Sequence, residues 1–275
     1  MRGKFQVIIL LLSLVLSPLA SAENKRPYDI PYPSDCHLVR LEIYVKQLGD
    51  TIKCFQTILF DKLNLEFFVW AFEKEGGAEW AKDVLDIGTG TGALAITALA
   101  YGAQKAVGTD LDPLAIENAR FNAKRLGLTD RFDVRQVPME NPGIYSVIGK
   151  DERFDLIVCD PPQGMMSHPA AKKAGQAHVM KEEFFGTDQK YRFLISFMEG
   201  LDKHLKDNGR AWVCLRYTDA KKKVAELADK HGFNMRALLS WSYDVDPKKE
   251  IPVGNNFRVP PDTANIILYE LKRKR

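Results

Sequence analysis

The chain has 275 residues, of which 45% are hydrophobic and 27% charged, and its formal net charge at pH 7 is +3. This composition excludes a disordered or repetitive protein, and the length allows one large α/β domain with a small extension. The small net charge gives no support to a nucleic-acid-binding surface, because the basic clusters at 221–223 and 272–275 are typical of solvated helix faces and tails.

The first 22 residues differ from the rest of the chain. Arg2 and Lys4 precede an apolar run at 5–16, and an Ala-Ser-Ala sequence at 20–22 places small residues where a signal peptidase cleaves. We therefore expect residues 1–22 to be a signal peptide and the protein to be exported to the periplasm or secreted, whereas an unprocessed chain would be cytoplasmic. No permanent membrane span is expected after processing, because the apolar run is too short for one.

Residues 23–80 are expected to form an N-terminal arm and a helical extension. The arm, 24–34, is rich in proline and tyrosine, which favours an extended backbone. Leucine and valine side chains at helical spacing then predict a helix from about 35 to 49, and residues 51–60 are expected to form a strand. Residues 63–72 predict a second, strongly apolar helix. We expect this extension to act as a lid or docking element, not as an independent domain.

The four cysteines lie in two settings. Cys159 and Cys214 lie in apolar runs, where a thiol packs as a small hydrophobic side chain. Cys36 and Cys54 lie in the extension and could form a disulfide in an exported protein. The sequence has no CxxC and no histidine and cysteine cluster with metal-ligand spacing, so no metal site is expected.

Residues 81–275 alternate between short apolar strands and helices. This alternation predicts an α/β domain with a mostly parallel, twisted sheet that is covered by helices on both faces. The expected strands are 84–87, 105–109, 132–137, 154–159, 211–215 and 265–271, and the expected helices are 93–101, 112–127, 191–205 and 218–231.

A glycine-rich loop lies between the first strand and the first helix of this domain. Glycines let the backbone approach a ligand closely, and the helix N-terminus behind them offers free N–H groups. Asp110 ends the next strand, where a carboxylate can accept hydrogen bonds from ribose hydroxyls. These features also fit a dinucleotide fingerprint, which leaves an NAD(P)-dependent oxidoreductase open. The loop consists of Gly88, Thr89, Gly90, Thr91 and Gly92.

Asp86 lies two residues before the first glycine, at the end of the first strand. A carboxylate so close to the loop would repel a pyrophosphate, whereas it would attract an ammonium group. S-adenosylmethionine carries an amino group and a sulfonium cation and has no phosphate. Asp86 therefore favours S-adenosylmethionine over a dinucleotide.

A second polar sequence, Asp160-Pro161-Pro162-Gln163, follows the strand at 154–159. It is expected at the carboxyl edge of the sheet, where ligands of open α/β sheets bind. The two prolines have no N–H, so the loop presents acceptors, namely the Asp160 carboxylate and the Pro161 carbonyl. Paired acceptors suit an amine or amide nitrogen that is to receive a methyl group. The alternative is a turn that only ends the strand.

Three segments together resemble the class I S-adenosylmethionine-dependent methyltransferases, in order and in spacing. They are VLDIGTGTGALAI at 84–96, VGTDLDPLAIENAR at 107–120 and DLIVCDPPQ at 155–163. The chain is most similar to the groups that modify ribosomal protein L11 and release-factor glutamine, and to the "small" methyltransferase domain. The resemblance covers roughly residues 83–233. It implies a Rossmann-like methyltransferase fold and methyl transfer from S-adenosylmethionine.

The resemblance also implies roles for particular residues. Asp86 and the glycine loop would hold the methionine end of the cofactor, Asp110 would hold the ribose, and Leu111 is also expected to bind the cofactor. The family often has an acidic residue after the third strand, near the adenine amino group. This residue is not evident here, and Met139 or Glu140 is expected to take its place.

The loop from Asp160 to Gln163 would be catalytic by the same resemblance. It departs from the family in having Gln163 where an aromatic residue usually stacks on a flat target. A protein or small-molecule acceptor is therefore expected, and nucleic acid less so. The departure also leaves open a catalytically inactive methyltransferase-fold protein that binds a partner.

Overall fold

The structure is a computed structural model, and all of the residues that it describes belong to one compact unit, 32–275. The expected signal peptide, the proline-rich arm and Cys36 lie outside the described residues, as do three predicted site residues, Met139, Pro162 and Gln163. None of the described helices is long and apolar enough to cross a membrane. The described residues are 37–56, 58, 60–138, 143–161, 191–242, 251–253, 257–259 and 265–275.

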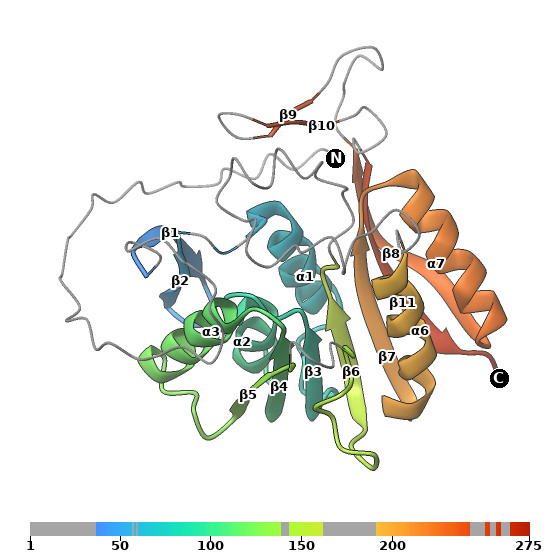
Figure 1. Cartoon of the computed structure of the whole chain (residues 1–275), viewed down its shortest axis with the longest axis horizontal. Coiled ribbons are helices and arrows are strands. Elements are labelled where there is room, and N and C mark those ends of the chain that lie inside the picture. The colour runs from blue at the N-terminus through green and yellow to red at the C-terminus, as the bar shows by residue number, and fades with distance from the viewer. Residues whose placement is uncertain are drawn as a thin grey trace. The chain divides into compact units, whose positions relative to one another are not determined.

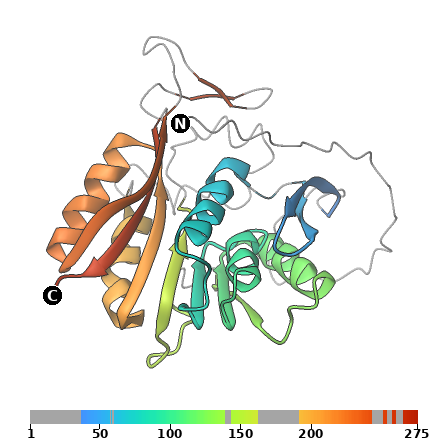
Figure 2. The ribbon, with the colours of Figure 1, turned by 180° about the vertical axis from the view of Figure 1, so that it is seen from behind.

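Seven strands form the main sheet in the order β5-β4-β3-β6-β7-β11-β8 (Figure 1, Figure 2). The strands from β5 to β7 pair in parallel, whereas β11 pairs antiparallel with both β7 and β8. The predicted α/β fold with a mostly parallel sheet is therefore confirmed. The strands are β3 Asp83–Ile87, β4 Lys105–Asp110, β5 Phe132–Gln136, β6 Phe154–Cys159, β7 Leu205–Leu215, β8 Phe233–Ser242 and β11 Asn265–Arg273.

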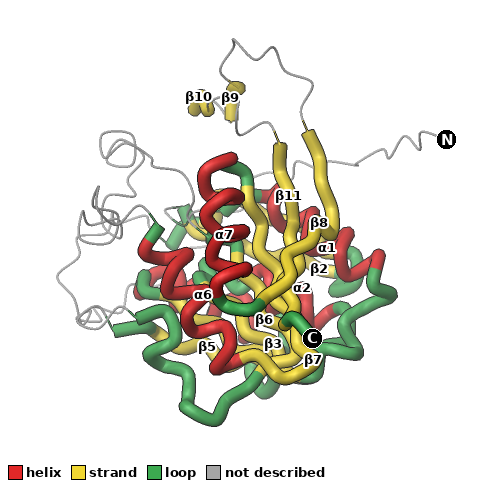
Figure 3. Tube along the Cα trace, turned by 90° about the vertical axis from the view of Figure 1, so that its right-hand side faces the viewer, coloured by secondary structure: helices red, strands yellow, loops and turns green. Residues whose placement is uncertain are grey.

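Helices cover both faces of this sheet, because neighbouring residues of a strand point to opposite faces. Val84 and Leu156 pack on one face with α1, α2 and α3. Leu85 and Ile157, the next residues along each strand, pack on the other face with α6 and α7. Figure 3 shows the two helix layers on either side of the strands. The helices are α1 Lys62–Lys74, α2 Ala93–Ala100, α3 Pro113–Arg125, α6 Arg192–His204 and α7 Thr218–Lys230.

The prediction of a helix at about 35–49 is wrong. Residues Val39–Val45 form strand β1, which pairs antiparallel with β2 (Asp50–Phe55), and Gly49 adopts a φ of +63° in the turn between them. Leu41 and Val45 have a spacing of four, which a helix and a strand share, and the alternation of Leu41, Ile43 and Val45 at a period of two fits the strand. Leu41, Ile43 and Val45 are more buried than Arg40, Glu42 and Tyr44, with which they alternate.

Strand β8 was not expected from the sequence either. It lies at the edge of the main sheet and pairs with β11 alone among the described strands. Most of its side chains are exposed or half-buried, so its sequence lacks the apolar run of a central strand. A short hairpin of β9 (Ile251–Val253) and β10 (Phe257–Val259) was also unforeseen.

Two buried asparagines of α3 hold the β1–β2 hairpin on the domain. Asn118 accepts a hydrogen bond from the Phe55 backbone N–H (2.9 Å) and donates one to the Lys53 carbonyl (2.9 Å). Asn122 accepts from the Lys53 N–H (3.0 Å) and donates both to the Lys53 carbonyl (2.8 Å) and to the Thr91 carbonyl in the glycine loop (2.9 Å). These side chains supply partners that the hairpin backbone would otherwise take from water.

Cys54 of β2 is a free, buried thiol. Its Sγ donates weak hydrogen bonds to the carbonyls of Phe55 (3.4 Å) and Ile58 (3.7 Å). Cys54 therefore serves as a packed side chain in this structure, and Cys36, its expected disulfide partner, lies outside the described residues.

We expect Asn118→Ala to lower the free energy of unfolding by about 1–3 kcal/mol, because it removes two hydrogen bonds from a fully buried contact. Urea unfolding measures this change. Glu226→Ala is a suitable control, since its partner Lys223 lies on the surface of α7 and Glu226 is 66% exposed. Equal stability of the two variants would mean that Asn118 does not anchor the hairpin.

Candidate active site

The strand order reverses between β3 and β6, which pair in parallel up to Ile87 and Cys159. The chain proceeds from β3 to β4 and β5 on one side and from β6 to β7 on the other. The carboxyl ends of these strands meet at one edge, which is the usual ligand-binding edge of an open α/β sheet. Asp86, Asp110 and Asp160 therefore come together there from three separate parts of the sequence.

The glycine loop requires its glycines. Gly88, Gly90 and Gly92 have φ values of +73°, +55° and +81°, which other residues rarely adopt. A Cβ on Gly92 would lie 2.8 Å from Cε1 of Phe132, so no larger residue fits there without a shift. The loop is held against β4, because the N–H of Gly88 donates to the Thr109 carbonyl at 2.9 Å.

Asp86 is fully buried beneath this loop. Its Oδ2 accepts hydrogen bonds from Thr89 Oγ1 (2.7 Å) and from the Ala95 N–H (3.1 Å). Its Oδ1 accepts none from the residues that the structure describes, and the buried Thr91 hydroxyl likewise has no partner there. Burial raises the pKa of Asp86 to about 7, against the effect of the two hydrogen bonds. An acceptor atom without a partner at this position suits a ligand that brings N–H donors.

Asp110 ends β4 on the other side of the glycine loop. Its Oδ2 accepts a hydrogen bond from the Gly90 N–H (2.9 Å), and its Oδ1 accepts one from the Asp112 N–H (2.9 Å). Burial and, to a smaller extent, the nearby Asp112 carboxylate raise the pKa of Asp110 to about 6, against the effect of its backbone hydrogen bonds. Each carboxylate oxygen has a second lone pair, so Asp110 can still accept ribose hydroxyls. Leu111 follows Asp110 at the same edge.

These groups fit a cationic ligand better than a phosphate. Asp86, Asp110 and Asp112 place three carboxylates beside the loop, and together they would repel a pyrophosphate. An ammonium group would gain a buried acceptor in Asp86 Oδ1 and would favour the ionised form of that carboxylate. Among the described residues, no group of three or more histidine, cysteine, aspartate or glutamate side chains is placed to hold a metal ion.

Asp160 lies directly after β6, next to the end of β3. The Asn64 side-chain Nδ2 donates to both of its carboxylate oxygens, at 2.8 Å and 2.9 Å. Burial raises the pKa of Asp160 to about 7. The Asn64 hydrogen bonds lower it, whereas the charge of Asp61 raises it. Pro161, the next residue, is buried. Both the protonated and the ionised form of Asp160 are therefore expected near neutral pH.

Three residues of this site, namely Asp61, Asn64 and Arg216, were not identified from the sequence. Asn64 Oδ1 accepts hydrogen bonds from Arg216, from Nε at 3.0 Å and from Nη2 at 2.7 Å. Arg216 also forms an ion pair with Asp61, which caps the N-terminus of α1. One feature of the sequence could have indicated Asn64: it is a polar residue on the apolar face of the predicted helix, three residues after a capping aspartate. Helix α1 therefore contributes directly to the site.

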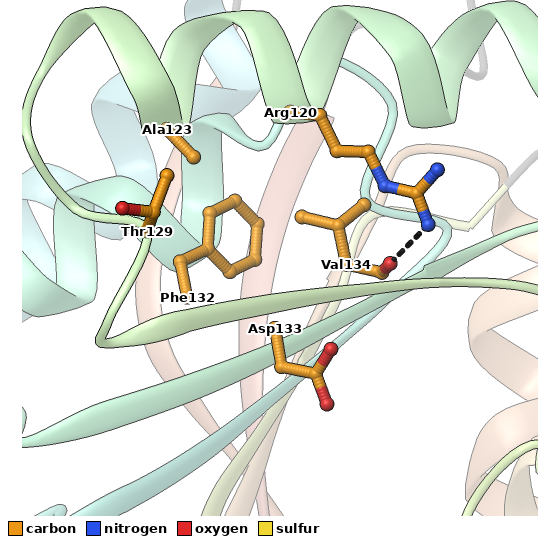
Figure 4. A pocket seen from close by; sticks show the side chains of 6 residues that line it. All are labelled: Arg120, Ala123, Thr129, Phe132, Asp133 and Val134. Atoms are coloured by element: carbon orange, nitrogen blue, oxygen red, sulfur yellow. Dashed lines mark hydrogen bonds between the residues drawn. The ribbon is translucent and has the colours of Figure 1, made fainter.

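A hollow in the surface lies elsewhere, between α3 and β5 (Figure 4). Arg120 Nη2 donates there to the Val134 carbonyl at 2.8 Å. It includes none of the predicted site residues, and its polar groups are partly used within the protein. We therefore place the candidate active site at the carboxyl edge of the sheet. The lining residues of the hollow are Arg120, Ala123, Thr129, Phe132, Asp133 and Val134.

The sheet order, the glycine loop and the acidic strand ends are those of the class I methyltransferase fold, and solved structures share it. The YcgJ protein of Bacillus subtilis aligns with a TM-score of 0.50 and 14% identity, over 78% of this chain and all of that one. A proposed RNA methyltransferase of Pyrococcus horikoshii aligns with a TM-score of 0.50 and 17% identity, over 85% and 92% of the two chains. At such identities the likeness shows the fold alone.

The sequence comparisons are more specific over a shorter segment. Residues 71–161 match the ribosomal protein L11 methyltransferase family. The chain is 49% identical to the ribosomal protein L11 methyltransferase of Enterobacter sp. (strain 638) over 63 residues. These residues are 23% of this chain and 21% of that protein. The corresponding protein of Salmonella arizonae is 49% identical over 61 residues, 22% and 20% of the two chains. The chain thus matches about a fifth of the length of these relatives, and the resemblance to class I methyltransferases is confirmed.

The expectation of an exported protein is contradicted by these comparisons. The matched relatives are named for a ribosomal protein, and ribosomal proteins are assembled and used in the cytoplasm. The prediction of a periplasmic or secreted location was therefore wrong. It rested on the charged and apolar character of residues 1–22, which lie outside the described residues.

The raised pKa of Asp86 predicts a pH-dependent stability for the ligand-free protein. Its value of about 7 in the folded state lies above the value of about 3.9 expected when unfolded. The folded protein therefore binds more protons between these values, and its free energy of unfolding falls as pH rises through them. We expect a smaller fall between about pH 5 and pH 8 in Asp86→Asn, measured by urea unfolding.

Asp133→Asn is the matched control, because Asp133 lies on β5 with a side chain that is 59% exposed. This variant should keep the pH dependence of the wild type. An Asp86→Asn protein with the same pH dependence as the wild type would show that Asp86 is not the buried carboxyl group that the structure indicates.

Proposed function

We propose that the protein is a methyltransferase that moves a methyl group from S-adenosylmethionine to an amine or amide nitrogen. The observation that carries the proposal is the meeting of two groups at one sheet edge. Asp86 offers a buried acceptor atom, beside the glycine loop, that has no partner among the residues the structure describes, and Asp160 follows the adjacent strand. The first group suits the cationic end of the cofactor, and the second suits a nitrogen that is to be methylated.

The cofactor side would be assembled from the glycine loop and its neighbours. Asp86 and the loop would hold the amino-acid end, Asp110 would accept hydrogen bonds from the ribose, and Leu111 would also contact the cofactor. We assign Met139 to the adenine, although it lies outside the described residues. When bound, S-adenosylmethionine supplies an electrophilic methyl group on a sulfonium.

The acceptor side would be formed by Asp160 and the Pro161 carbonyl. Both can accept hydrogens from a nitrogen and so direct its lone pair toward the methyl group. The ionised Asp160 carboxylate would also offset the positive charge that develops on the nitrogen during transfer. Because the pKa of Asp160 is about 7, this role is lost as pH falls below that value.

A protein or small-molecule acceptor is proposed in preference to a nucleobase. Pro162 and Gln163 complete the Asp160 loop in the sequence, and a glutamine side chain has no face on which a flat base could stack. The small net charge of +3 also gives little attraction to a phosphate backbone. The relatives are named for a protein acceptor, which agrees with this choice.

We expect Asp110→Ala to weaken S-adenosylmethionine binding by roughly 1.5–3 kcal/mol for each charge-assisted hydrogen bond that is lost. Isothermal titration calorimetry measures the change, with NADH titrated in parallel. Wild-type protein that binds NADH but not S-adenosylmethionine would refute the cofactor assignment and restore the oxidoreductase alternative.

We expect Asp160→Ala to abolish methyl transfer and to leave S-adenosylmethionine affinity nearly unchanged, because the residue faces the acceptor. The measurement is transfer of a radiolabelled methyl group to protein extracts, free nucleobases and oligonucleotides. Asp229→Ala is the control, since Asp229 lies at the surface of α7 with 83% of its side chain exposed. Label found mainly on adenine in DNA, together with an active Asp160→Ala variant, would contradict both the substrate class and the catalytic role.

A further inference from the structure

We propose that Asn64, in the first turn of α1, is a positioning residue that orients the Asp160 carboxylate toward the methyl acceptor. This inference rests on the proposed function, since it concerns how the acceptor side of that site works. It assigns a role in the reaction to the segment before the main sheet, whose residues the sequence motifs do not include.

The geometry of the contact restrains the whole carboxylate group. Asn64 Nδ2 lies 2.8 Å from one oxygen of Asp160 and 2.9 Å from the other, and Asn64 is only 5% exposed. A donor placed almost equally from both oxygens restricts rotation of the carboxylate plane. It also leaves a lone pair on each oxygen for another donor, such as a nitrogen of the substrate.

The orientation of the Asn64 amide follows from its other partner. Arg216 approaches Asn64 Oδ1 with two nitrogens, at 3.0 Å and 2.7 Å. A guanidinium can only donate, so the amide oxygen must face Arg216 and the amide nitrogen must face Asp160. The reversed amide would place a donor against the guanidinium and an acceptor against the carboxylate.

Arg216 is itself held in place. It pairs with Asp61, whose Oδ1 caps α1 by accepting hydrogen bonds from the Leu63 N–H (2.9 Å) and the Asn64 N–H (3.2 Å). The start of α1 and the ends of β6 and β7 are therefore joined through one asparagine side chain. A site supported in this way keeps its acting group within a narrow range of positions.

The charged surroundings of Asp160 make the Asn64 contact important for its ionisation. Asp61 from α1 and Asp86 from β3 disfavour the charged form, whereas Arg216 after β7 favours it. The thiols of Cys159 in β6 and Cys214 in β7 are buried nearby, and burial holds the pKa of each well above its usual value, so both are neutral. Asn64 adds hydrogen bonds to the ionised form without adding a charge to the site.

The test measures the titration of Asp160 directly in the ligand-free protein. Carbon-13 NMR of protein labelled at aspartate carboxyl groups follows the midpoint, and the Asp160 signal is identified by its loss in Asp160→Asn. We expect Asn64→Ala to raise the midpoint by about one pH unit, because a hydrogen bond to the ionised form is lost. Asn118→Ala is the matched control, as it removes another buried asparagine that lies on α3 and contacts β2.

Two further measurements keep the inference testable if Asn64→Ala does not fold. Asn64→Asp keeps the acceptor that Arg216 contacts and places a second carboxylate beside Asp160, so the pair should titrate with a clearly higher second midpoint. In the wild type, the Asn64 side-chain amide signal should shift with the same midpoint as Asp160. A folded variant with an unchanged Asp160 midpoint, or a wild-type amide signal that does not follow Asp160, would overturn the inference.

The rate of methyl transfer gives a second readout. Below both midpoints, a shift of one unit predicts about a tenfold lower rate for Asn64→Ala, and the difference should shrink at alkaline pH. Affinity for S-adenosylmethionine should not change. A loss of rate that is the same at every pH, together with an unchanged Asp160 midpoint, would indicate a merely structural role and would contradict the inference. Failure of the wild type to bind S-adenosylmethionine would refute the proposed function alone, because the titration of Asp160 needs no cofactor.

Discussion

The cost of holding carboxylates away from water is the constraint on which this site depends. Asp86, Asp110 and Asp160 meet at the carboxyl edge of the sheet, and burial raises the pKa of each to between about 6 and 7. Backbone and side-chain donors offset part of this cost, but the pKa of each carboxyl group remains raised. The ligand-free edge is therefore prepared for a cation and for a hydrogen-bond donor, and both demands agree with a sulfonium cofactor and a nitrogen acceptor.

The segment before the main sheet is built into this edge in two places. The β1–β2 hairpin is held by asparagines of α3, and the first turn of α1 holds the Asp160 carboxylate. The two contacts serve the opposite sides of the site, since Asn122 reaches the glycine loop and Asn64 reaches the acceptor side. The expectation of a lid or docking element thus describes the segment incompletely, because its side chains take part in the site.

Much of the domain could be predicted because its signals are local. The glycines at positive φ, the Asp112 and Pro113 start of α3, and the apolar strand β6 each depend on neighbours in the sequence. The acceptor-side network could not be predicted in this way. Asn64 contacts Asp160 across 96 residues and Arg216 across 152, and no spacing rule connects such positions. Strand β1 was mistaken for a helix because Leu41 and Val45, which are four residues apart, fit both periods.

The hydrogen bonds of Asn122 have a consequence for how this protein can be divided or recombined. One amide nitrogen donates to the carbonyls of Lys53 in the hairpin and of Thr91 in the glycine loop. A fragment that began at the first strand of the main sheet would keep every glycine of the loop and would still lose the hairpin carbonyl that fixes this amide. It would also lose the donor on Asp160. The smallest exchangeable unit of this protein therefore includes the β1–β2 hairpin and α1, and it is longer than the segment that carries the recognisable motifs.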